Sequence, residues 1–413
     1  MLPSVTMSAG TPGEAEVGDH KGKRVAVIGG GPGGAQCARR LAEAGVDVTV
    51  FEPRVRFEKA CGGGIPARGL ERYPFLLDTG LAGKAVRECL VVAPSGREAR
   101  FPLEHPLYVF SRGALHSFML SRAATAGARV VRARVVSFRN DRGAWDVRAA
   151  AAGGGEADPF GPFDFIVAAD GAAGAARRRL LLSTSGADVS QGIGYYLPDV
   201  SEEFVTLKFY DRLHGYLWVF PRPDHSSAGI CATLGALPVS GLRGLMDDFL
   251  KSRYPAAAVE AAERYAALIP GAPQDPGSER LQGDGWALIG DAARLVDPLT
   301  REGIYYAMIS GDLLAEALCR GQPEQYTDAW ADQGARELSW AAAHGNGFFD
   351  ARFIERLVFL AAASPAIARV LSDVISGRQT YRTLKRRLLL NVPLVAAQLV
   401  RRAVTAPLRR RDS

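Results

Sequence analysis

Cysteine and histidine are scarce in this sequence, and neither forms a pattern typical of a disulfide framework or a metal site. The 413 residues include five cysteines and six histidines. The cysteines are odd in number, scattered and without a CxxC pair, which argues against structural disulfides and a structural zinc site. The histidines show no HxxxH or HExxH spacing, so no metal centre is predicted.

Long hydrophobic runs are also missing. No stretch of about 18 apolar residues, the length that suggests a membrane-spanning helix, is present. The best candidate, residues 388–400, is interrupted by Asn391 and Pro393. Residues 1–20 contain neither the apolar nor the basic region of a secretory signal, so we expect a disordered leader there. A start at Met7 would fit equally well.

The remaining composition is that of a folded protein. Hydrophobic residues make up 47% and charged residues 23% of the chain, which excludes a wholly disordered or collagen-like polypeptide. At about 150 residues per domain, the length predicts two or three domains with a sizeable core.

A nucleotide-binding pattern occupies the front of the chain. A β-branched run at 23–28 predicts a buried strand, and the sequence GGGPGG at 29–34 leads into a helix that ends at Gly45. A second strand at 46–51 ends in Glu52. This is a G-x-G-x-x-G motif between a strand and a helix, followed by an acid at the spacing of a dinucleotide-binding βαβ unit.

The residue types in this motif suit the binding of a pyrophosphate. Gly29 forms the tight turn, Gly31 lets the backbone approach the phosphates, and Gly34 lets the helix pack close to the strand. The helix N-terminus offers free N–H groups and a partial positive charge. Glu52 can accept hydrogen bonds from ribose hydroxyls. The predicted cofactor contacts in this segment are Gly29, Gly31, Pro32, Gly33, Gly34 and Glu52.

Two later stretches favour a long cofactor such as FAD over NAD. Residues 163–171 form a strand that runs into an Asp-Gly pair, and residues 286–304 contain a strand, a Gly-Asp turn, a proline and a glycine that opens a helix. The N-terminus of that helix could face the pyrimidine carbonyl of a flavin. An aspartate that only caps a turn is the alternative interpretation. The predicted contacts are Asp170, Gly171, Gly290, Asp291, Pro298, Gly303 and Ile304.

With these three motifs, the sequence resembles the FAD-dependent glutathione-reductase-like superfamily, on its p-hydroxybenzoate-hydroxylase branch. Arg112 matches the arginine that opens the long helix of this branch and contacts the cofactor. The Asp-Gly motif continues as DGAAGAARRR, with alanine where the superfamily has serine or threonine. The resemblance covers residues 23–320 and implies an FAD-binding α/β domain.

Three further stretches narrow the resemblance to the geranylgeranyl reductase family. They are FEKACGGGIPARGL at 57–70, GYLWVFPR at 215–222 and LTREGIYYAMISG at 299–311. The sequence departs from the family pattern at Arg222, where lysine is usual, and at Cys231 and Arg301, where glycine is common. The resemblance implies saturation of isoprenoid C=C bonds by reduced FAD.

Residue types in these stretches fit that chemistry. Side chains alternate along a strand, so Tyr216, Trp218 and Phe220 would share one face and could contact a prenyl chain; ordinary sheet packing is the alternative. Cys61 precedes three glycines, where a backbone can approach a ligand closely, or it is a small buried residue. The predicted catalytic residues are Cys61, Tyr216 and Trp218. The predicted substrate contacts are Gly62, Gly63, Tyr216, Trp218, Phe220, Pro221 and Tyr305.

The electron donor and two alternative functions stay open on sequence alone. No second G-x-G-x-x-G motif is present, so NAD(P)H or reduced ferredoxin is expected as a transient donor, and a donor protein is a candidate partner. An FAD-dependent monooxygenase of a hydrophobic substrate is the first alternative. A halogenase is disfavoured because YLWVFP replaces W-x-W-x-I-P. A non-catalytic, membrane-associated flavin or lipid carrier is the more distant alternative.

The predicted architecture is α/β: a Rossmann-type FAD-binding domain with an inserted antiparallel β-sheet substrate domain and a helical C-terminal region. The FAD-binding domain is assigned to residues 21–75, 106–180 and 276–345. The substrate domain is assigned to residues 76–105 and 181–275. Residues 346–413 are predicted to be helical, with breaks at Pro365, Pro393 and Pro407.

Positive charge is concentrated at the C-terminal end. Residues 378–413 contain ten basic residues and one acid, so the rest of the chain carries −3 of the total +6. This acidic body argues against nucleic acid as a partner. Basic clusters on both sides of LLLNVPLVAAQLV predict a helix that lies on an anionic membrane, with a solvated or packed terminal helix as the alternative. We therefore expect a cytoplasmic protein, peripheral on the inner face of the membrane, that acts on a hydrophobic prenyl substrate.

Overall fold

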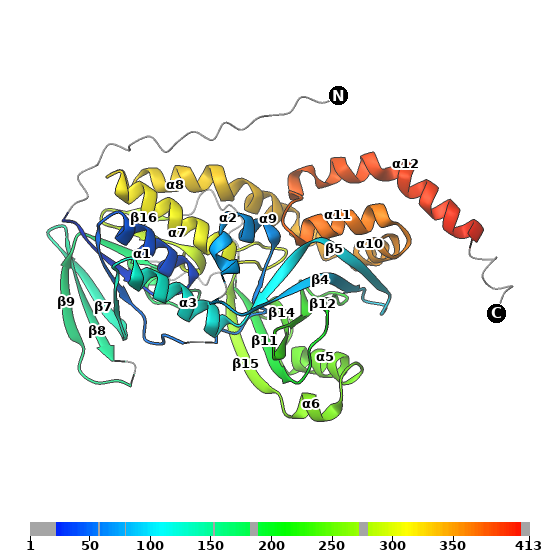
Figure 1. Cartoon of the computed structure of the whole chain (residues 1–413), viewed down its shortest axis with the longest axis horizontal. Helices are drawn as coiled ribbons and strands as arrows, with labels where there is room; N and C mark the ends of the chain where they lie inside the picture. Colours follow the sequence, from blue (N-terminus) through cyan, green and yellow to red (C-terminus); the bar gives the residue numbers. More distant parts are fainter. Residues whose placement is uncertain are drawn as a thin grey trace.

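A computed structural model describes residues 22–405, except 57, 79, 152, 182–188 and 272–279. The leader predicted at 1–20 lies outside the described residues. A six-stranded sheet with its helices lies toward one end of the molecule, an eight-stranded sheet occupies the middle, and the last helices cover the other end (Figure 1). The α/β fold class predicted from the sequence is confirmed.

The six-stranded sheet contains the strands of the predicted nucleotide motif. Its order is β16-β17-β10-β1-β2-β6, and all neighbours are parallel except β16 and β17. Strands β1, β2 and β10 are almost entirely apolar and buried, as expected for parallel strands that helices cover on both faces. The strands are β1 (Arg24–Ile28), β2 (Asp47–Phe51), β6 (Arg129–Val131), β10 (Phe165–Ala168), β16 (Gln282–Gly283) and β17 (Trp286–Leu288).

Helices α1, α3 and α7 accompany this sheet, and α1 packs closely on α7. Helix α1 begins at Pro32, whose fixed φ and missing N–H suit the first helical turn. The helices of this part are α1 (Pro32–Glu43), α2 (Ala67–Arg72), α3 (Arg112–Thr125), α4 (Ala176–Leu181), α7 (Ile304–Cys319) and α8 (Gln325–Trp330). Short 3-10 turns lie at Pro74–Leu77 and Gly290–Ala293, and a π-helical turn lies at Ala331–Ala335.

A small antiparallel sheet projects at the outer end of this part (Figure 1). Its strands are β7 (Ala133–Asp141), β8 (Ala144–Ala151) and β9 (Asp158–Phe163), in that order. Residues 153–157 lie between β8 and β9, which pair antiparallel. The two strands therefore form a hairpin.

The eight-stranded sheet has the order β15-β11-β14-β13-β12-β4-β5-β3 and is antiparallel except for the parallel pair β4 and β12. Along β13, Leu217 and Val219 join a hydrophobic core with α5, whereas Tyr216 and Phe220 pack against a second core on the opposite face. The strands are β3 (Gly64–Ile65), β4 (Gly83–Val92), β5 (Glu98–Phe110), β11 (Val189–Pro198), β12 (Phe204–Lys208), β13 (Gly215–Pro221), β14 (His225–Thr233) and β15 (Glu263–Pro270), with helices α5 (Val239–Lys251) and α6 (Ala256–Glu260).

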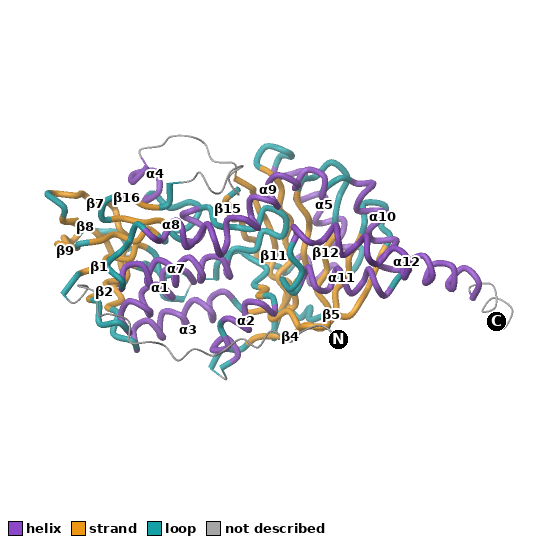
Figure 2. Tube along the Cα trace, turned by 90° about the horizontal axis from the view of Figure 1, so that it is seen from above, coloured by secondary structure: helices purple, strands orange, loops and turns teal. Residues whose placement is uncertain are grey.

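The C-terminal region is helical, and α10 and α11 pack on β5. Its helices are α9 (Arg336–Phe348), α10 (Ala351–Ala363), α11 (Pro365–Ile375) and α12 (Tyr381–Thr405). Helix α12 runs beside α11 and extends beyond the rest of the molecule in both views (Figures 1 and 2). Among the described residues, no single helix is long and apolar enough to span a membrane. The pair α10 and α11 meets the test of length and composition together but bends by 117° between them.

The prolines of this region behave differently from one another. The break predicted at Pro365 is confirmed, because Pro365 begins α11. The break predicted at Pro393 is wrong, because Pro393 lies inside α12. The helix is exposed there, so the carbonyl that loses its N–H partner stays accessible to water. Pro407 lies outside the described residues.

Candidate active site

A cavity of about 320 Å³ runs between the two large sheets. Its walls at one end are Gly31, the first residues of α1 and the start of α7. The middle is lined by residues 59–64, which we call the Cys61 loop, and by β13, and the far end by α10, α11 and the start of α12. The cavity therefore joins the predicted cofactor motifs to the predicted substrate strand.

The glycines of the first motif have backbone geometry that suits the roles predicted for them. Gly29 has φ +103°, and a Cβ at Gly34 would lie 2.0 Å from the carbonyl oxygen of Gly29, so the turn and the close helix packing both require glycine. Gly31 lines the cavity, and a Cβ there would meet no protein atom within 4 Å. Helix α1 begins without a side-chain cap, so its first N–H groups remain available to an anionic ligand.

Glu52 lies at the end of β2, beside this loop. Its carboxylate accepts hydrogen bonds from the backbone N–H of Gly30 at 2.9 Å and of Arg54 at 3.0 Å. His116 on α3 places its Nε2 3.8 Å from the same carboxylate. Burial lowers the pKa of His116, although Glu52 acts in the opposite direction. Glu52 does not line the cavity, and its role toward a ribose stays a prediction.

The two later motifs reach the same region. Asp170 accepts a hydrogen bond from the backbone N–H of Ala176 at 3.0 Å, so it caps a turn; burial raises its pKa. Asp291 lines the cavity and lies 2.6 Å from Nζ of Lys59. Burial alone would raise the pKa of Asp291, but the positive charge of Lys59 lowers it. Gly303 precedes α7, which also has no side-chain cap.

The donors around the cavity fit FAD. Two uncapped helix N-termini, those of α1 and α7, face it from separate segments of the chain. Arg112 also lines the cavity, and its buried Nε has no acceptor among the described residues. Open space beside Gly31 admits a pyrophosphate. An elongated ligand with phosphates and carbonyl oxygens satisfies all of these donors.

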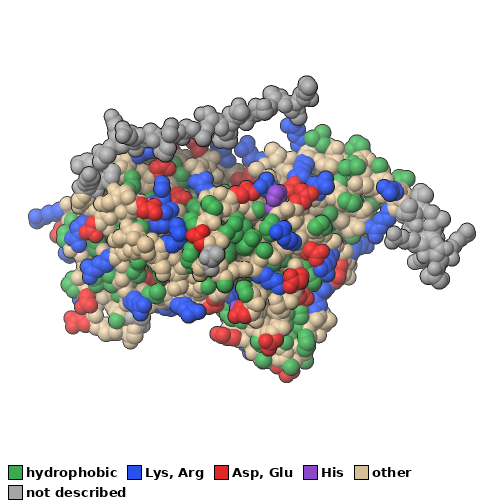
Figure 3. All heavy atoms as spheres, in the orientation of Figure 1, with side chains coloured by type: hydrophobic (Ala, Val, Ile, Leu, Met, Phe, Trp, Pro, Cys, Tyr) green, Lys and Arg blue, Asp and Glu red, His purple; other side chains and the backbone are tan. Residues whose placement is uncertain are grey.

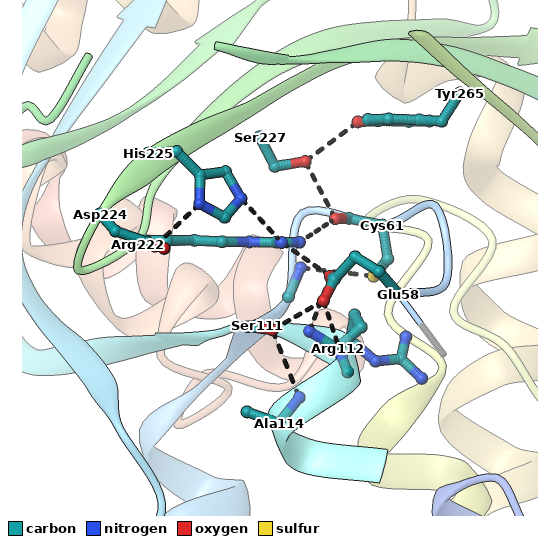
Figure 4. A network of polar contacts seen from close by, with 12 residues as sticks. Glu58, Cys61, Ser111, Arg112, Ala114, Arg222, Asp224, His225, Ser227 and Tyr265 are labelled. Atoms are coloured by element: carbon teal, nitrogen blue, oxygen red, sulfur yellow. Dashed lines mark hydrogen bonds and ion pairs between the residues drawn. The ribbon is translucent and has the colours of Figure 1, made fainter. Parts of the chain in front are cut away.

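The Cys61 loop is held in place by a buried polar network (Figure 4). The carbonyl oxygen of Cys61 accepts hydrogen bonds from the guanidinium of Arg222 at 2.9 Å and from the hydroxyl of Ser227 at 3.0 Å. The Cys61 sulfur accepts a hydrogen bond from the N–H of Gly63 at 3.3 Å. Gly63 has φ +85°, and a Cβ there would lie 2.1 Å from the carbonyl oxygen of Phe110. The loop therefore needs glycine at this position to lie against β5.

Glu58 connects this network to the start of α3, a role that no motif in the sequence indicates. Its carboxylate accepts hydrogen bonds from the Ser111 hydroxyl at 2.6 Å and from the N–H groups of Arg112 and Gly113 at 2.8 and 2.7 Å. Arg222 donates to it at 2.7 Å. Burial alone would raise the pKa of Glu58, but the charge of Arg222 and these hydrogen bonds lower it. Glu58 therefore stays ionised and orders both the loop and the helix.

Tyr216, Trp218 and Phe220 of β13 line the cavity, and we call them the aromatic wall. The Tyr216 hydroxyl donates to the carbonyl oxygen of Thr300, in the loop that precedes α7. Burial raises the pKa of Tyr216 well above its usual value. Phe220 lies against the Cys61 loop, where a Cβ at Gly62 would come within 2.8 Å of the ring. The aromatic wall therefore contacts both the loop that precedes α7 and the Cys61 loop.

Most of the predicted site residues line the cavity. The exceptions are Gly29, Glu52, Asp170, Pro298, Pro221 and Tyr305. The ring of Tyr305 packs on the guanidinium of Arg68, with its centroid 4.5 Å away. Its predicted role toward substrate stays a prediction.

Several site residues have no recognisable signal in the sequence. Arg68 on α2 forms an ion pair with Glu302. The Tyr381 hydroxyl donates to Asp297 at 3.0 Å, which ties the start of α12 to the loop before α7. Of these residues, only Asp297 and Glu302 could have been proposed from the sequence as site residues, because they are adjacent to the predicted residues Pro298 and Gly303.

Comparison with known proteins agrees with these motifs. A family model described as pyridine nucleotide-disulphide oxidoreductase matches residues 23–96. The chain is 30% identical to a menaquinone reductase of Mycolicibacterium smegmatis, over 74% of this chain and 78% of that protein. It is 28% identical to digeranylgeranylglycerophospholipid reductase 2 of Methanopyrus kandleri, over 77% of this chain and 84% of that protein.

The fold is shared with a solved structure of a geranylgeranyl bacteriochlorophyll reductase-like protein from Thermoplasma acidophilum. The TM-score is 0.70 at 21% identity, over 89% of this chain and 98% of that one. Fold and site together define an FAD-dependent oxidoreductase with a Rossmann-type cofactor domain and an inserted substrate sheet. Within that class, the chain belongs to the geranylgeranyl reductase family.

Proposed function

We propose that this protein saturates C=C bonds of a geranylgeranyl-type prenyl chain carried by a lipid, quinone or chlorophyll-like head group. Reduced FAD, when bound, supplies a hydride to one alkene carbon, and NAD(P)H or reduced ferredoxin restores its electrons. A proton adds to the other carbon. The π bond is lost and two new C–H bonds form, so electrons and protons balance.

A single observation carries this proposal: the aromatic wall and the two uncapped helix N-termini line one continuous cavity. An isolated alkene has no carbonyl group to polarise, so its reduction depends on positioning in a site without bulk water. The wall supplies apolar surface at the required place. The far end of the cavity is also apolar, with Ile354, Val358 and Leu371 in its lining, and provides room for the rest of a long chain.

The proton source within this site is the Cys61 thiol in our proposal. Cys61 lines the cavity, and its backbone is fixed by Arg222 and Ser227. Tyr216 also lines the cavity, but its hydroxyl proton is engaged by Thr300 and burial raises its pKa. Tyr216 and Trp218 therefore orient the alkene, while Cys61 protonates it.

The reductase proposal is tested by anaerobic incubation of the FAD-loaded protein with prenyl substrates and a chemical reductant. Mass spectrometry should show products heavier by about two mass units for each reduced bond. Substrate-dependent oxygen consumption with a hydroxylated product would instead identify a monooxygenase. A purified protein without flavin absorbance would leave only the carrier alternative.

We further propose that α12 docks on an anionic membrane surface. In the middle of the helix the exposed residues are apolar, with Leu389 62%, Leu390 71% and Val392 55% exposed. Basic residues flank them, including Lys385 and Arg401, and each near an anionic surface contributes about 1 kcal/mol. Apolar and basic side chains lie next to one another on the face of the C-terminal helices seen in Figure 3. This arrangement suits a helix that lies in the membrane interface.

Docking there would bring the cavity to the membrane. The lining includes Gln379 and Tyr381, at the turn between α11 and α12 and at the first residue of α12. A prenyl chain would then pass from the bilayer into the cavity without crossing water. The proposed location is the cytoplasmic face of the membrane.

A further inference from the structure

Arg301 lies in the cavity wall in a backbone conformation that normally requires glycine. It is one of the positions at which the sequence departs from the geranylgeranyl reductase pattern, which has glycine there. Its φ is +57°, a left-handed conformation that is unfavourable for a residue with a Cβ. Its N–H donates to the carbonyl oxygen of Asp297 at 2.9 Å. Backbone strain that persists next to a site indicates that the side chain has a use there.

Arg301 lies in the loop that precedes α7, which contacts the substrate sheet where the Tyr216 hydroxyl donates to the carbonyl oxygen of Thr300. Arg301 lines the cavity together with Tyr216 and Trp218 of the aromatic wall. Burial raises the pKa of Cys231 and of Tyr216, and the Arg301 charge acts on both in the opposite direction. The guanidinium therefore lies beside the aromatic wall. Cys231 is itself a departure from glycine, so two departures from the family pattern meet at this point.

The charge of Arg301 has no carboxylate to balance it among the described residues. Two other cations that line the cavity, Lys59 and Arg68, form ion pairs with Asp291 and Glu302. Arg301 makes no such pair in the described part of the chain, and its buried Nε has no hydrogen-bond acceptor there. An unpaired guanidinium charge in the wall of an apolar cavity is energetically unfavourable, and an anion that binds to it removes this cost.

We infer that Arg301 binds a phosphate group of the prenyl substrate, an inference that rests on the proposed function. Arg112, the other lining cation without an ion pair among the described residues, opens α3 and belongs to the predicted cofactor contacts. Arg301 instead lies between the aromatic wall and α7, where substrate and cofactor meet. A guanidinium matches two oxygens of a phosphate and balances its charge. A neutral carbonyl group would accept a hydrogen bond but would leave the charge uncompensated.

This assignment fixes the direction of the substrate. The phosphate lies near the start of α7, and the prenyl tail follows the aromatic wall toward α10 and α11. Two kinds of molecule carry the required group, a free prenyl diphosphate and a prenyl glycerophospholipid. Both present a phosphate oxygen close to the first isoprene unit, so both are tested.

The test compares Arg301→Gly, which restores the family residue, with Arg142→Gly. Arg142 also has a positive φ, 53°, but lies in the exposed turn between β7 and β8, so both changes relieve the same kind of backbone strain. Each FAD-loaded protein is assayed for kcat/KM with geranylgeranyl diphosphate, digeranylgeranylglycerophospholipid and the uncharged alcohol geranylgeraniol. A second readout uses oxidised protein without reductant, titrated with geranylgeranyl diphosphate and followed by flavin fluorescence.

In Arg301→Gly, the preference for a phosphate-bearing substrate over geranylgeraniol should fall by about 10- to 100-fold, the range for a hydrogen bond to a charged group. The Kd of geranylgeranyl diphosphate should rise by a similar factor. Arg301→Lys keeps the charge but not the planar fork, so its substrate preference and Kd should lie between those of the original protein and those of Arg301→Gly. Arg142→Gly should have the preference and Kd of the original protein. If the preference over geranylgeraniol falls only for geranylgeranyl diphosphate, Arg301 binds a free diphosphate. If it falls only for the glycerophospholipid, Arg301 binds a lipid phosphate.

Failure of the proposed function and failure of the phosphate assignment would give different results. If the original protein reduces none of the three substrates, the proposed function fails. If it reduces them and Arg301→Gly keeps the original preference and Kd, the function stands and the phosphate assignment is overturned. Arg301→Lys and Arg301→Gln provide the same comparison should the glycine variant not fold.

Discussion

The pairing of Arg222 with Glu58 shows what a single substitution within a family does. Lysine is usual at this position, but Arg222 uses its planar group to contact three partners at once: the Glu58 carboxylate, the Cys61 carbonyl oxygen and the His225 ring. Its side chain is completely buried. A lysine ammonium has no such fork, so we attribute the rigid position of the Cys61 loop in this chain to arginine.

Loss of the Glu58 charge should therefore destabilise the fold. Glu58→Gln removes the partner of a buried guanidinium, and removal of one partner of a buried pair costs about 3 kcal/mol or more. Urea unfolding of the FAD-free protein at neutral pH measures the change. The matched control is Glu88→Gln, which breaks the exposed pair with Arg100 and should cost less than about 1 kcal/mol. Equal effects in the two variants would contradict the role assigned to Glu58.

The same pair predicts a pH dependence. The pKa of Glu58 is lower in the folded protein than its ordinary value of about 4.3 in an unfolded chain. Its contribution to stability is therefore fully present above that ordinary value and is lost as the pH falls through the lower, folded pKa. The stability difference between the original protein and Glu58→Gln should be constant from pH 7 down to about 5 and shrink in more acidic solution. Unfolding curves at successive pH values measure it, and a difference that grows in acid would refute this account.

At Cys61, removal of the thiol separates catalysis from packing. Cys61→Ala should lower kcat for prenyl reduction by about 100-fold or more, since general acid catalysis contributes about 10²–10⁴. The flavin spectrum should not change. Cys319→Ala, at the last residue of α7, is the control because Cys319 does not line the cavity. Full turnover in Cys61→Ala would leave the cysteine with a packing role alone.

At the scale of single elements, the N-terminus of α1 has open space beside Gly31 and no side-chain cap. Gly31→Ala adds a methyl group that meets no protein atom, so the fold should be preserved. The methyl group would separate the N–H groups from the pyrophosphate, and FAD affinity should fall by about 10- to 100-fold. Flavin fluorescence titration measures the Kd, and circular dichroism of the FAD-free protein checks the fold.

The control for this variant is Gly244→Ala on α5, which also meets no neighbouring atom. It should bind FAD like the original protein and gain slightly in stability, because alanine favours a helix. Unchanged FAD affinity in Gly31→Ala would show that the pyrophosphate lies elsewhere.

Helices, strands and turns that depend on a pattern of neighbouring residues could be predicted from the sequence. The first strand, the glycine turn and α1 follow from apolar runs and from Gly29 and Gly34, which act within a few residues of each other. Contacts between distant segments could not be predicted, because nothing local marks them. Glu58 and Arg222 are 164 positions apart, and each alone looks like an ordinary surface charge. The helix break predicted at Pro393 was wrong for a related reason. Whether a helix tolerates an internal proline depends on its solvent exposure, which adjacent residues do not reveal.

At the scale of the whole molecule, α12 extends beyond the other helices and sheets. Its proposed role in membrane binding can be tested by substitution. Truncation is unsuitable because Tyr381 is buried and bonded to Asp297. Leu389→Ser with Leu390→Ser removes exposed apolar surface without touching that contact. Co-sedimentation with vesicles that contain phosphatidylglycerol should fall by about 10-fold or more, since each leucine side chain buried in lipid contributes about 1.5–3 kcal/mol.

The matched control changes exposed apolar residues elsewhere. Leu234 and Val239 are 53% and 45% exposed and lie beside the substrate sheet. Their replacement by serine should leave vesicle binding unchanged. Higher salt should weaken binding of the original protein, because the basic residues act through screened charges. Equal binding by the α12 variant and the original protein would reject the membrane proposal.

The contact between α1 and α7 has a consequence for the synthesis of the protein. A Cβ at Gly311 would lie 2.5 Å from the carbonyl oxygen of Gly33, so α1 packs against a helix encoded nearly 280 codons later. The dinucleotide motif at the front of the nascent chain leaves the ribosome early, yet its site is incomplete until α7 has emerged. We therefore expect FAD loading to be a late event in biosynthesis. Chains released before residue 311 should stay colourless and be available to proteases, which makes flavin content a measure of completed translation.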